Sequence, residues 1–242
     1  MLINLDLKQI EVVVAAQLSK DPTLIHLLNN GLDMHRYVAA DVYNKSETDV
    51  TDEERQAAKA IDFQLFYGAG ANKISLTTGH SFEWCKEFIE KFYIMFPKIK
   101  DWHDSMILRV NMSGNLELWD GMILKFKQYE AKFDWQDPTK LYYNPAEIKN
   151  YPVQHSAFVI ISAFIAEFMR LKALHNRDKY LLINTVHDSV MLDCRPEHIE
   201  QAQNDLKEVL DKLPETLYNK FGLKLLVPIT ADISTGLTWY DL

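Results

Sequence analysis

Two aspartates stand where strands are expected to end, and their side chains are suited to metal chemistry. Asp6 lies near the end of the apolar run LINLDL, and Asp188 lies between two further apolar runs. Taken singly, a carboxylate at a turn is most often a solvated turn residue. Two carboxylates held side by side repel each other and require cations between them. A pair of divalent ions about 4 Å apart serves in-line displacement at phosphorus, and hard oxygen ligands favour Mg²⁺. The spacing alone does not establish that the two residues meet.

A second set of chemically useful side chains recurs every four residues: Arg55, Lys59, Phe63 and Tyr67. On a helix, adjacent members of such a series lie nearly above one another. Two cations followed by two aromatic rings suit a nucleotide triphosphate, with phosphates on the cations and the base against a ring. The alternative is a solvated cationic turn followed by core aromatics.

The helix that would carry this series has the clearest start signal in the chain. Thr51 and Glu54 have the spacing of a capping box, and the helix is expected to break at Gly68 and Gly70. Ala58, Ile61 and Leu65 fall on its opposite side at spacings of three and four, which predicts that this side is buried.

The remaining pattern predicts an α+β fold with an antiparallel sheet and a large helical insertion. Strands are expected at residues 2–6, 181–183, 190–192 and 224–236, the middle two joined by a tight turn at 184–188. Residues 115–143 are turn-rich and read as a hairpin or an irregular loop. Helices are expected at 9–20, 24–28, 34–42, 82–96, 98–110, from Pro152 onward, and at 196–213.

Composition narrows the class of protein. Of 242 residues, 48% are hydrophobic and 25% charged, which is typical of a globular chain. The net charge of −8 excludes a charge-driven nucleic-acid coat protein, although an enzyme can gather its basic residues in one groove. Cys85 and Cys194 are too few for a disulfide framework, so we expect buried, reduced thiols. We see no signal peptide and no apolar run long enough to span a bilayer, which favours a soluble, cytoplasmic protein without a membrane partner.

Five segments resemble the motifs of family A DNA polymerases, the bacterial DNA polymerase I type. DLKQIE (Asp6–Glu11), RQAAKAIDFQLFYG (Arg55–Gly68) and TVHDS (Thr185–Ser189) are similar to the three polymerase motifs. DMHR (Asp33–Arg36) and NYPVQHSA (Asn150–Ala157) are similar to further family segments. Each motif is moderately specific by itself, but the five occur in the family's order and cover nearly the whole chain.

The resemblance implies a palm domain at 1–20 and 147–242, a fingers domain at 21–146, and a polymerase site. Two Mg²⁺ ions would be held by Asp6, Asp188 and the backbone carbonyl of Leu7. Glu11 would exclude the ribose 2′-hydroxyl; the alternative is an exposed acid at a helix start. These residues would catalyse template-directed addition of dNTPs to a primer 3′-hydroxyl, in a bacterial or phage-infected cell.

The resemblance also assigns roles in binding the nucleotide and the DNA. Arg55 and Lys59 would bind the triphosphate, and Lys59 would also protonate the leaving pyrophosphate. His35 would contact the triphosphate, although a helical histidine by itself is usually a surface or core residue. Phe63 would stack near the sugar and base, and Tyr67 would guard the templating position. The primer–template would be contacted near its terminus by Asn150, Gln154 and His187.

The sequence departs from the family at several positions. Ser189 replaces an auxiliary glutamate, and Asp62 and Gln64 replace the usual Asn and Gly. Basic residues usually follow the position of Gly121; Lys125 and Lys127 substitute for them only in part.

The family's thumb and first palm segment have no counterpart in these residues. With the net charge of −8, this predicts weak DNA binding by the chain alone. We therefore hypothesise a split polymerase, such as one encoded by a phage, whose second polypeptide supplies the thumb and upstream palm. The alternatives are a non-catalytic DNA-binding or assembly subunit and a single-subunit RNA polymerase, which Glu11 disfavours.

Overall fold

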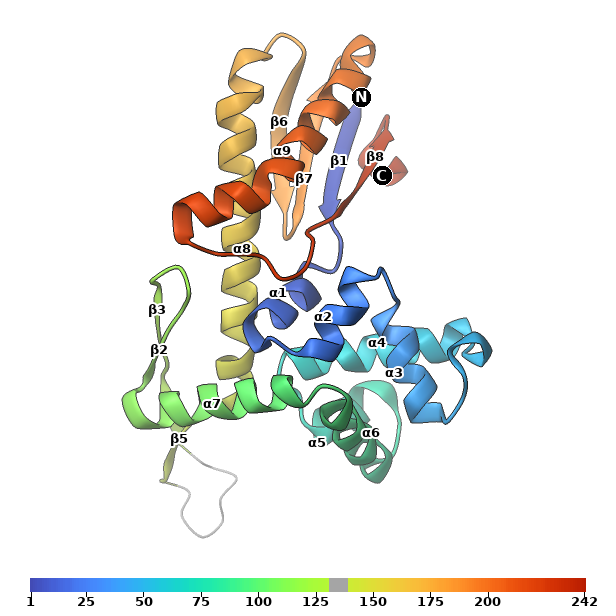
Figure 1. The fold of residues 1–242 in the computed structure, drawn as a ribbon, viewed down its shortest axis with the longest axis vertical. Coiled ribbons are helices and arrows are strands. Elements are labelled where there is room, and N and C mark those ends of the chain that lie inside the picture. The colour runs from blue at the N-terminus through green and yellow to red at the C-terminus, as the bar shows by residue number, and fades with distance from the viewer. Residues whose placement is uncertain (131–138) are drawn as a thin grey trace. The chain divides into compact units, whose positions relative to one another are not determined.

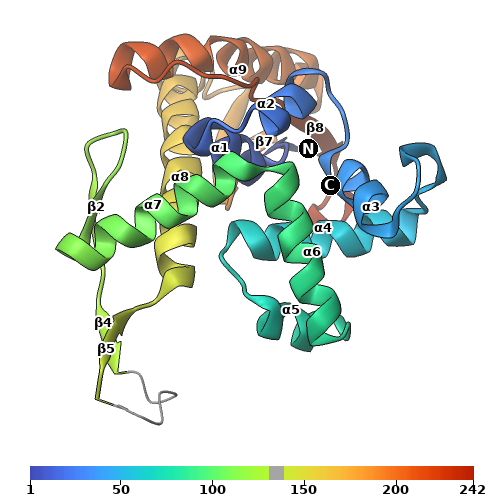
Figure 2. The same ribbon diagram turned by 60° about the horizontal axis from the view of Figure 1, so that its bottom comes forward.

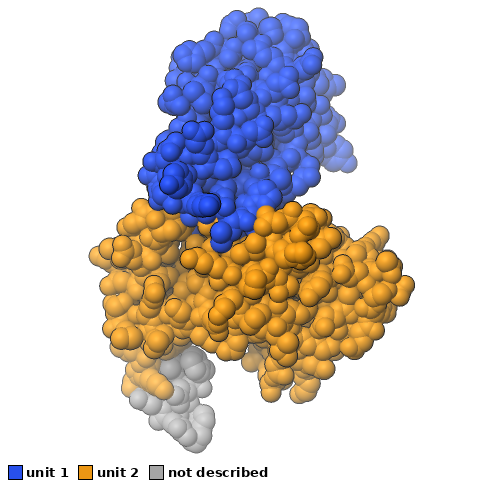
Figure 3. Space-filling view, in the orientation of Figure 1, with its two compact units in different colours: residues 1–14, 154–242 blue, residues 15–153 orange. Residues whose placement is uncertain are grey.

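The computed structural model describes residues 1–130 and 139–242, and within them the chain forms two compact units. One unit comprises residues 1–14 and 154–242, and the other comprises residues 15–153 (Figure 3). The assignment of palm to 1–20 and 147–242 and of fingers to 21–146 stays a prediction.

The first unit is built on a four-stranded sheet in the order β6-β7-β1-β8 (Figure 1). All three pairings are antiparallel, which confirms the expected α+β fold with an antiparallel sheet. The N-terminal strand is therefore central, although its two neighbours come from the far end of the chain. The strands are β1 (Leu2–Leu7), β6 (Tyr180–Val186), β7 (Ser189–Cys194) and β8 (Ala231–Gly236).

Alternation along β1 separates a core face of the sheet from an open face. Ile3, Leu5 and Leu7 are buried, whereas Asp6 between the last two is exposed. Helix α9 (Ile199–Phe221) lies across the strands, and α8 (Pro145–Leu171) runs beside them (Figures 1 and 2). The buried ring of Tyr180 ties the sheet to both helices: it stacks on Phe168 of α8 with 5.9 Å between centroids, and its hydroxyl donates to Asp205 of α9 at 2.6 Å.

The second unit is mainly helical and encloses a core of aromatic rings. The Phe92 ring of α6 lies 5.7 Å from the ring of Phe66 and 5.0 Å from that of Phe96, centroid to centroid. The helices are α1 (Ile10–Ser19, shared with the first unit), α2 (Pro22–Asn29), α3 (Met34–Tyr43), α4 (Asp52–Phe66), α5 (Ala71–Thr78), α6 (Phe82–Met95) and α7 (Pro97–Ser113). The short strands are β2 (Asn115–Glu117), β3 (Ile123–Lys125), β4 (Gln128–Glu130) and β5 (Leu141–Tyr143).

Helix α4 has the start, the buried face and the end that its sequence predicts. The amide of Glu54 donates to the Thr51 hydroxyl at 3.2 Å, and the amide of Thr51 donates to the Glu54 carboxylate at 3.0 Å, which confirms the capping box. Ala58, Ile61 and Leu65 are at most 1% exposed. The helix ends before Gly68, which has a φ of +73°.

Gly68 is also required by a close approach of α8. A Cβ at this position would lie 2.8 Å from the Lys149 Cδ atom and 3.1 Å from the Ala146 Cα atom. Both the positive φ and the lack of space therefore select glycine here.

Three expectations from the sequence are wrong in detail. The long helix α8 begins at Pro145, not after Pro152, which lies inside it. Helix α5 was not predicted, and the last strand is restricted to 231–236. The segment expected to form one hairpin or a loop contains two strand pairs, β2-β3 and β4-β5, and its residues 131–138 lie outside the described residues. In the described part of the chain, no helix is long and apolar enough to cross a membrane.

Candidate active site

The structure brings Asp6 and Asp188 to the same end of the sheet in the first unit. Asp6 is the penultimate residue of β1 and pairs in register with Ser189, the first residue of β7. The amide of Leu7 donates to the Asp188 carbonyl oxygen at 3.2 Å. Two residues 182 positions apart in sequence are thus neighbours across adjacent strands.

Asp188 is placed by a two-residue turn between β6 and β7. Val186 and Ser189 form the last strand pair, so His187 and Asp188 make the whole connection. His187 has a φ of +54°, the positive value that primed hairpin turns require at their first central residue. Histidine is among the residues that tolerate this region better than most. The exposed His187 and half-buried Asp188 therefore have their backbones fixed by the hairpin.

A third carboxylate, Asp232 on β8, belongs to the same face and was missed from the sequence. Asp232 is the cross-strand partner of Asp6 and forms an ion pair with Lys8 at 2.7 Å. Burial, with the negative charges of Asp188 and Asp232, raises the pKa of Asp6 above its ordinary value. The only sequence signal was the position of Asp232 in the last predicted strand, and its register against β1 is not visible without the fold.

This repulsion predicts that Asp6→Asn stabilises the metal-free protein at neutral pH. Because the folded-state pKa of Asp6 is raised, its contribution to stability is full below the ordinary aspartate pKa and is lost as the pH rises through the folded-state value. The variant has no ionisable carboxyl group at this position, so it does not lose this stability as the pH rises. We expect its melting temperature to exceed that of the wild type at pH 7 and to match it near pH 3, measured without divalent cations. A lower melting temperature for the variant at pH 7 would contradict the repulsion.

The oxygen atoms at this end of the sheet suit a hard cation. In the described residues there is no group of three or more His, Cys, Asp and Glu side chains arranged to hold a metal ion. The ligand set expected for Mg²⁺ is not a group of this kind, because it combines two carboxylates with the backbone carbonyl of Leu7. Mg²⁺ usually keeps several waters and binds one or two carboxylates plus substrate phosphates, so such a set is sufficient for it.

The other residues expected in the first unit lie on α1 and α8. Glu11 is half-buried in the first turn of α1, where the helix dipole favours a carboxylate. Gln154 is exposed on α8. Asn150, on the same helix but in the second unit, is half-buried, and its Oδ1 atom has no hydrogen-bond partner within the described residues. Cys85 and Cys194 are buried free thiols, as expected.

In the second unit, the cationic series of α4 faces α3 and is partly neutralised there. The Arg55 Nε atom donates to the Asp33 carboxylate at 2.5 Å. The Lys59 Nζ atom lies 5.8 Å from the centroid of the Phe63 ring. Arg55, Lys59, Phe63 and Tyr67 are all half-buried, so this face is neither fully solvated nor part of the core.

Asp33 has a structural role besides holding Arg55. It is the N-cap of α3, where its Oδ1 atom accepts from the Arg36 amide at 3.1 Å. Burial raises the pKa of Asp33, but the hydrogen bonds from Arg55 and from the Arg36 amide outweigh it, so the pKa is below its ordinary value. The aspartate therefore stays charged next to the guanidinium at neutral pH.

His35 is completely buried, in agreement with the core alternative for a helical histidine. Its Nδ1 atom lies 2.8 Å from Asp62 Oδ2, and its ring centroid is 5.5 Å from that of Phe63. A contact between His35 and a phosphate therefore requires a local movement of its surroundings.

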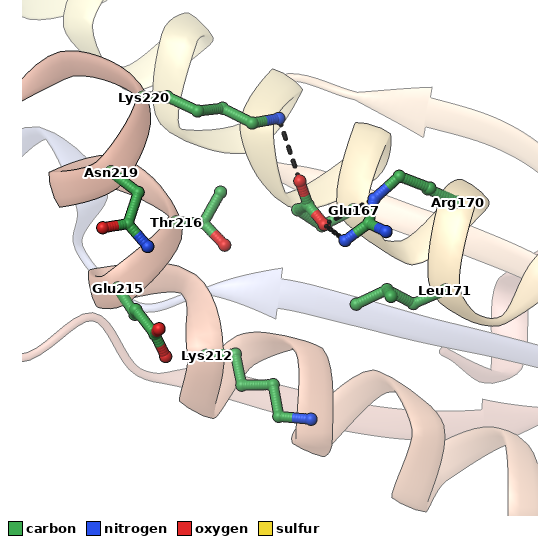
Figure 4. A pocket seen from close by; sticks show the side chains of 8 residues that line it. All are labelled: Glu167, Arg170, Leu171, Lys212, Glu215, Thr216, Asn219 and Lys220. Atoms are coloured by element: carbon green, nitrogen blue, oxygen red, sulfur yellow. Dashed lines mark hydrogen bonds and ion pairs between the residues drawn. The ribbon is translucent and has the colours of Figure 1, made fainter.

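A pocket of about 250 Å³ between α8 and α9 is separate from the predicted site residues. At its wall, Glu167 accepts from Arg170 at 2.6 Å and from Lys220 at 2.9 Å (Figure 4). Hydrogen bonds from Lys220 and Arg170 lower the pKa of Glu167. The carboxylate is thus already paired, and the pocket contains none of the residues expected to do chemistry.

The fold occurs in a solved structure described as the POL domain of Pol1 from M. smegmatis in complex with DNA primer-template and dNTP. The TM-score is 0.75, and the match covers 98% of this chain and 40% of that chain at 23% sequence identity. The fold is thus that of a polymerase domain. The profile of DNA polymerase family A matches residues 1–241, and the chain belongs to this family.

Curated relatives extend the match over almost the whole chain. DNA polymerase I of Aquifex aeolicus is 31% identical over 243 residues, which covers 97% of this chain and 38% of that protein. DNA polymerase I of Geobacillus stearothermophilus is 29% identical over 237 residues, covering 98% of this chain and 25% of that protein. The chain thus spans between a quarter and two fifths of the length of these relatives.

Proposed function

We propose that this chain performs template-directed DNA synthesis, adding dNTPs to a primer 3′-hydroxyl with release of pyrophosphate. The observation that carries the proposal is the meeting of Asp6 and Asp188 at one end of the sheet in a chain of this family. Burial and the charges of Asp188 and Asp232 raise the pKa of Asp6, and a bound cation would relieve the repulsion among these carboxylates, which supports a cation there.

Asp6, Asp188 and the Leu7 carbonyl would hold two Mg²⁺ ions, which supply activation of the 3′-hydroxyl and stabilisation of the leaving oxygen. The strand β1 and the turn at His187 fix the backbones of these residues before substrate arrives. Preorganised charges of this kind need no rearrangement during the reaction, which is the main source of electrostatic catalysis.

The helix α4 would bind the nucleotide. Arg55 and Lys59 carry the charges that a triphosphate needs, and Lys59 is the candidate donor of a proton to pyrophosphate. Phe63 offers a ring next to Lys59, and Tyr67 ends the same face at the C-cap of the helix. In this proposal Asn150, Gln154 and His187 contact the primer–template.

Glu11 is the proposed determinant of sugar selection. Replacing it with alanine removes the carboxylate expected to occupy the space of a ribose 2′-hydroxyl. We expect Glu11→Ala to raise incorporation of NTPs relative to dNTPs by about 10²-fold, the scale of discrimination that a shaped pocket provides. Competition between dATP and ATP on one primer–template measures the ratio. Lys8→Ala, a change of a neighbouring exposed residue, is the control and should leave the ratio unaltered. An unchanged ratio in Glu11→Ala would remove Glu11 from this role.

We further infer that a second polypeptide supplies a thumb and an upstream palm segment. The net charge of −8 supports this, because it gives the chain little general attraction to DNA. The sheet also leaves β6 and β8 at its edges, where further strands can pair.

Primer extension tests both the proposed DNA synthesis and the proposed need for a partner chain. We expect the 242-residue chain to extend a labelled primer weakly with Mg²⁺ and not at all with EDTA, and a partner chain to increase the length of the products. Processive synthesis by the chain alone would refute the need for a partner. No extension under any of these conditions, even with a partner that binds the chain, would favour the alternative of a non-catalytic subunit.

A further inference from the structure

Helices α3 and α4 are joined by three polar side-chain pairs, of which one is fully buried. Arg36 pairs with Asp52 at 2.9 Å, and Arg55 pairs with Asp33 at 2.5 Å; these four side chains are all partly exposed. The third pair, His35 and Asp62 at 2.8 Å, has both side chains 0% exposed.

The buried pair is costly at this position. Asp62 lies next to Ile61 on the apolar side of α4, and burial raises its pKa to about 6 although the hydrogen bond with His35 opposes the rise. Replacing a buried ion pair by apolar side chains is often neutral or stabilising, so stability alone does not account for an aspartate here. Asp33, Arg55 and Lys59 are the other charged groups near the pair on these two helices.

The pair also leaves two polar atoms unsatisfied. His35 Nε2 and Asp62 Oδ1 are buried without a hydrogen-bond partner in the described part of the chain. Such atoms are costly when nothing binds them and are uncommon in native proteins. Because His35 Nδ1 faces a carboxylate oxygen, Nδ1 carries a hydrogen, and Nε2 is the ring atom that remains for another group.

The neighbouring cation is held in the same manner. Asp33 accepts from Nε of Arg55, so the carboxylate binds the inner nitrogen of the guanidinium and does not take its Nη atoms in this hydrogen bond. In both pairs an aspartate fixes one nitrogen of a basic side chain, His35 or Arg55, that is proposed to bind the triphosphate. The Phe63 ring lies near His35, with 5.5 Å between the ring centroids, and belongs to the same helix as Arg55 and Lys59.

We propose that Asp62 is a positioning residue: it holds His35 through Nδ1 and thereby presents Nε2 to the triphosphate of an incoming nucleotide. The identity of the ligand rests on the proposed function, whereas the orientation of His35 rests on the hydrogen bond alone. The hydrogen bond needs only an acceptor oxygen, so asparagine can replace Asp62, but alanine cannot.

The experiment combines imidazole ¹⁵N NMR of the full chain with titration of dATP in the presence of Mg²⁺. We expect wild-type His35 to be protonated at Nδ1, to keep that state in Asp62→Asn, and to lose the preference in Asp62→Ala. We expect Asp62→Ala and His35→Ala each to weaken dATP binding about tenfold, and the double variant to bind no more weakly than either. Asp62→Asn should stay within about twofold of the wild type, and Gln56→Ala, an exposed change on α4, should have no effect.

Separate outcomes would overturn the two halves of the proposal. A His35 spectrum unaffected by Asp62→Ala, or additive losses of affinity for Asp62→Ala and His35→Ala, would remove Asp62 from its positioning role. A wild-type His35 signal that does not respond to dATP, in a protein that extends primers, would refute the triphosphate as the ligand of Nε2. Absence of both dATP binding and extension would instead count against the proposed function. Asp62→Leu, which fills the site without a polar group, takes the place of Asp62→Ala if that variant does not fold.

Discussion

Asp188→Asn is expected to lower the rate of primer extension by at least about 10³-fold. The side chain keeps its size but loses the negative charge that the proposed Mg²⁺ ions need, and loss of a preorganised electrostatic group at a reacting centre has effects of this order. Single-nucleotide incorporation under saturating dNTP, with a partner chain if one proves necessary, measures the effect.

The fold is expected to survive this substitution, which makes the result interpretable. Asp188 lies in a turn whose geometry depends on His187 and on the strand pairing, and its carbonyl still accepts from the Leu7 amide. Asp193→Asn is a matched control, since Asp193 is exposed and lies near the other end of the same strand β7. Equal rates for the wild type and Asp188→Asn would remove the two-metal mechanism from this chain.

Lys59→Ala is expected to reduce kcat/KM for dNTP incorporation by about 10²-fold, through a lower kcat and a higher KM. The ammonium group would bind the triphosphate in the ground state and would donate a proton as pyrophosphate leaves, and general acid catalysis contributes about 10²–10⁴-fold. Pre-steady-state incorporation at varied dNTP concentrations separates the two parameters.

The helix provides its own control for this prediction. Gln56→Ala changes an exposed residue three positions earlier on α4 and should leave both parameters within about twofold. Lys59→Arg keeps the charge and should restore KM more fully than kcat, because a guanidinium is a poor proton donor. A Lys59→Ala variant with a normal kcat would show that the proton comes from elsewhere.

Local signals allowed much of α4 to be predicted from the sequence. Thr51 and Glu54 act within one helical turn, and the burial of Ala58, Ile61 and Leu65 follows from their spacing. Such interactions involve residues close in sequence, so their outcome depends little on the rest of the fold.

The start of α8 shows where this reasoning fails. Pro152 was taken as a helix start, but Asn144 and Pro145 already supply one, since the Ala146 amide donates to the Asn144 side chain at 3.0 Å and proline is favoured in the first turn. Between two possible starts, the pattern of apolar residues after Pro152 gave no reason to choose the earlier one.

In the candidate site, too, some features could be predicted from the sequence and others depend on the fold. The residue types at Asp6 and Asp188 suggested their chemistry, but their meeting depends on which strands pair. The third carboxylate, Asp232, depends on the register of β8 against β1 and was therefore not found. The burial of His35 against Asp62 depends on how α3 packs on α4, which two separate helical patterns do not specify.

The central position of β1 has a consequence for how the protein is made. Residues 2–7 pair with strands at 189–194 and 231–236, so this segment is synthesised long before the strands that pair with its backbone. Closing so long a loop is slow, whereas the contacts among α2–α7 are available earlier during synthesis. We therefore expect nascent chains to acquire a protease-resistant helical part first, while the strand that carries Asp6 stays open to chaperones until residues 189–236 have been synthesised.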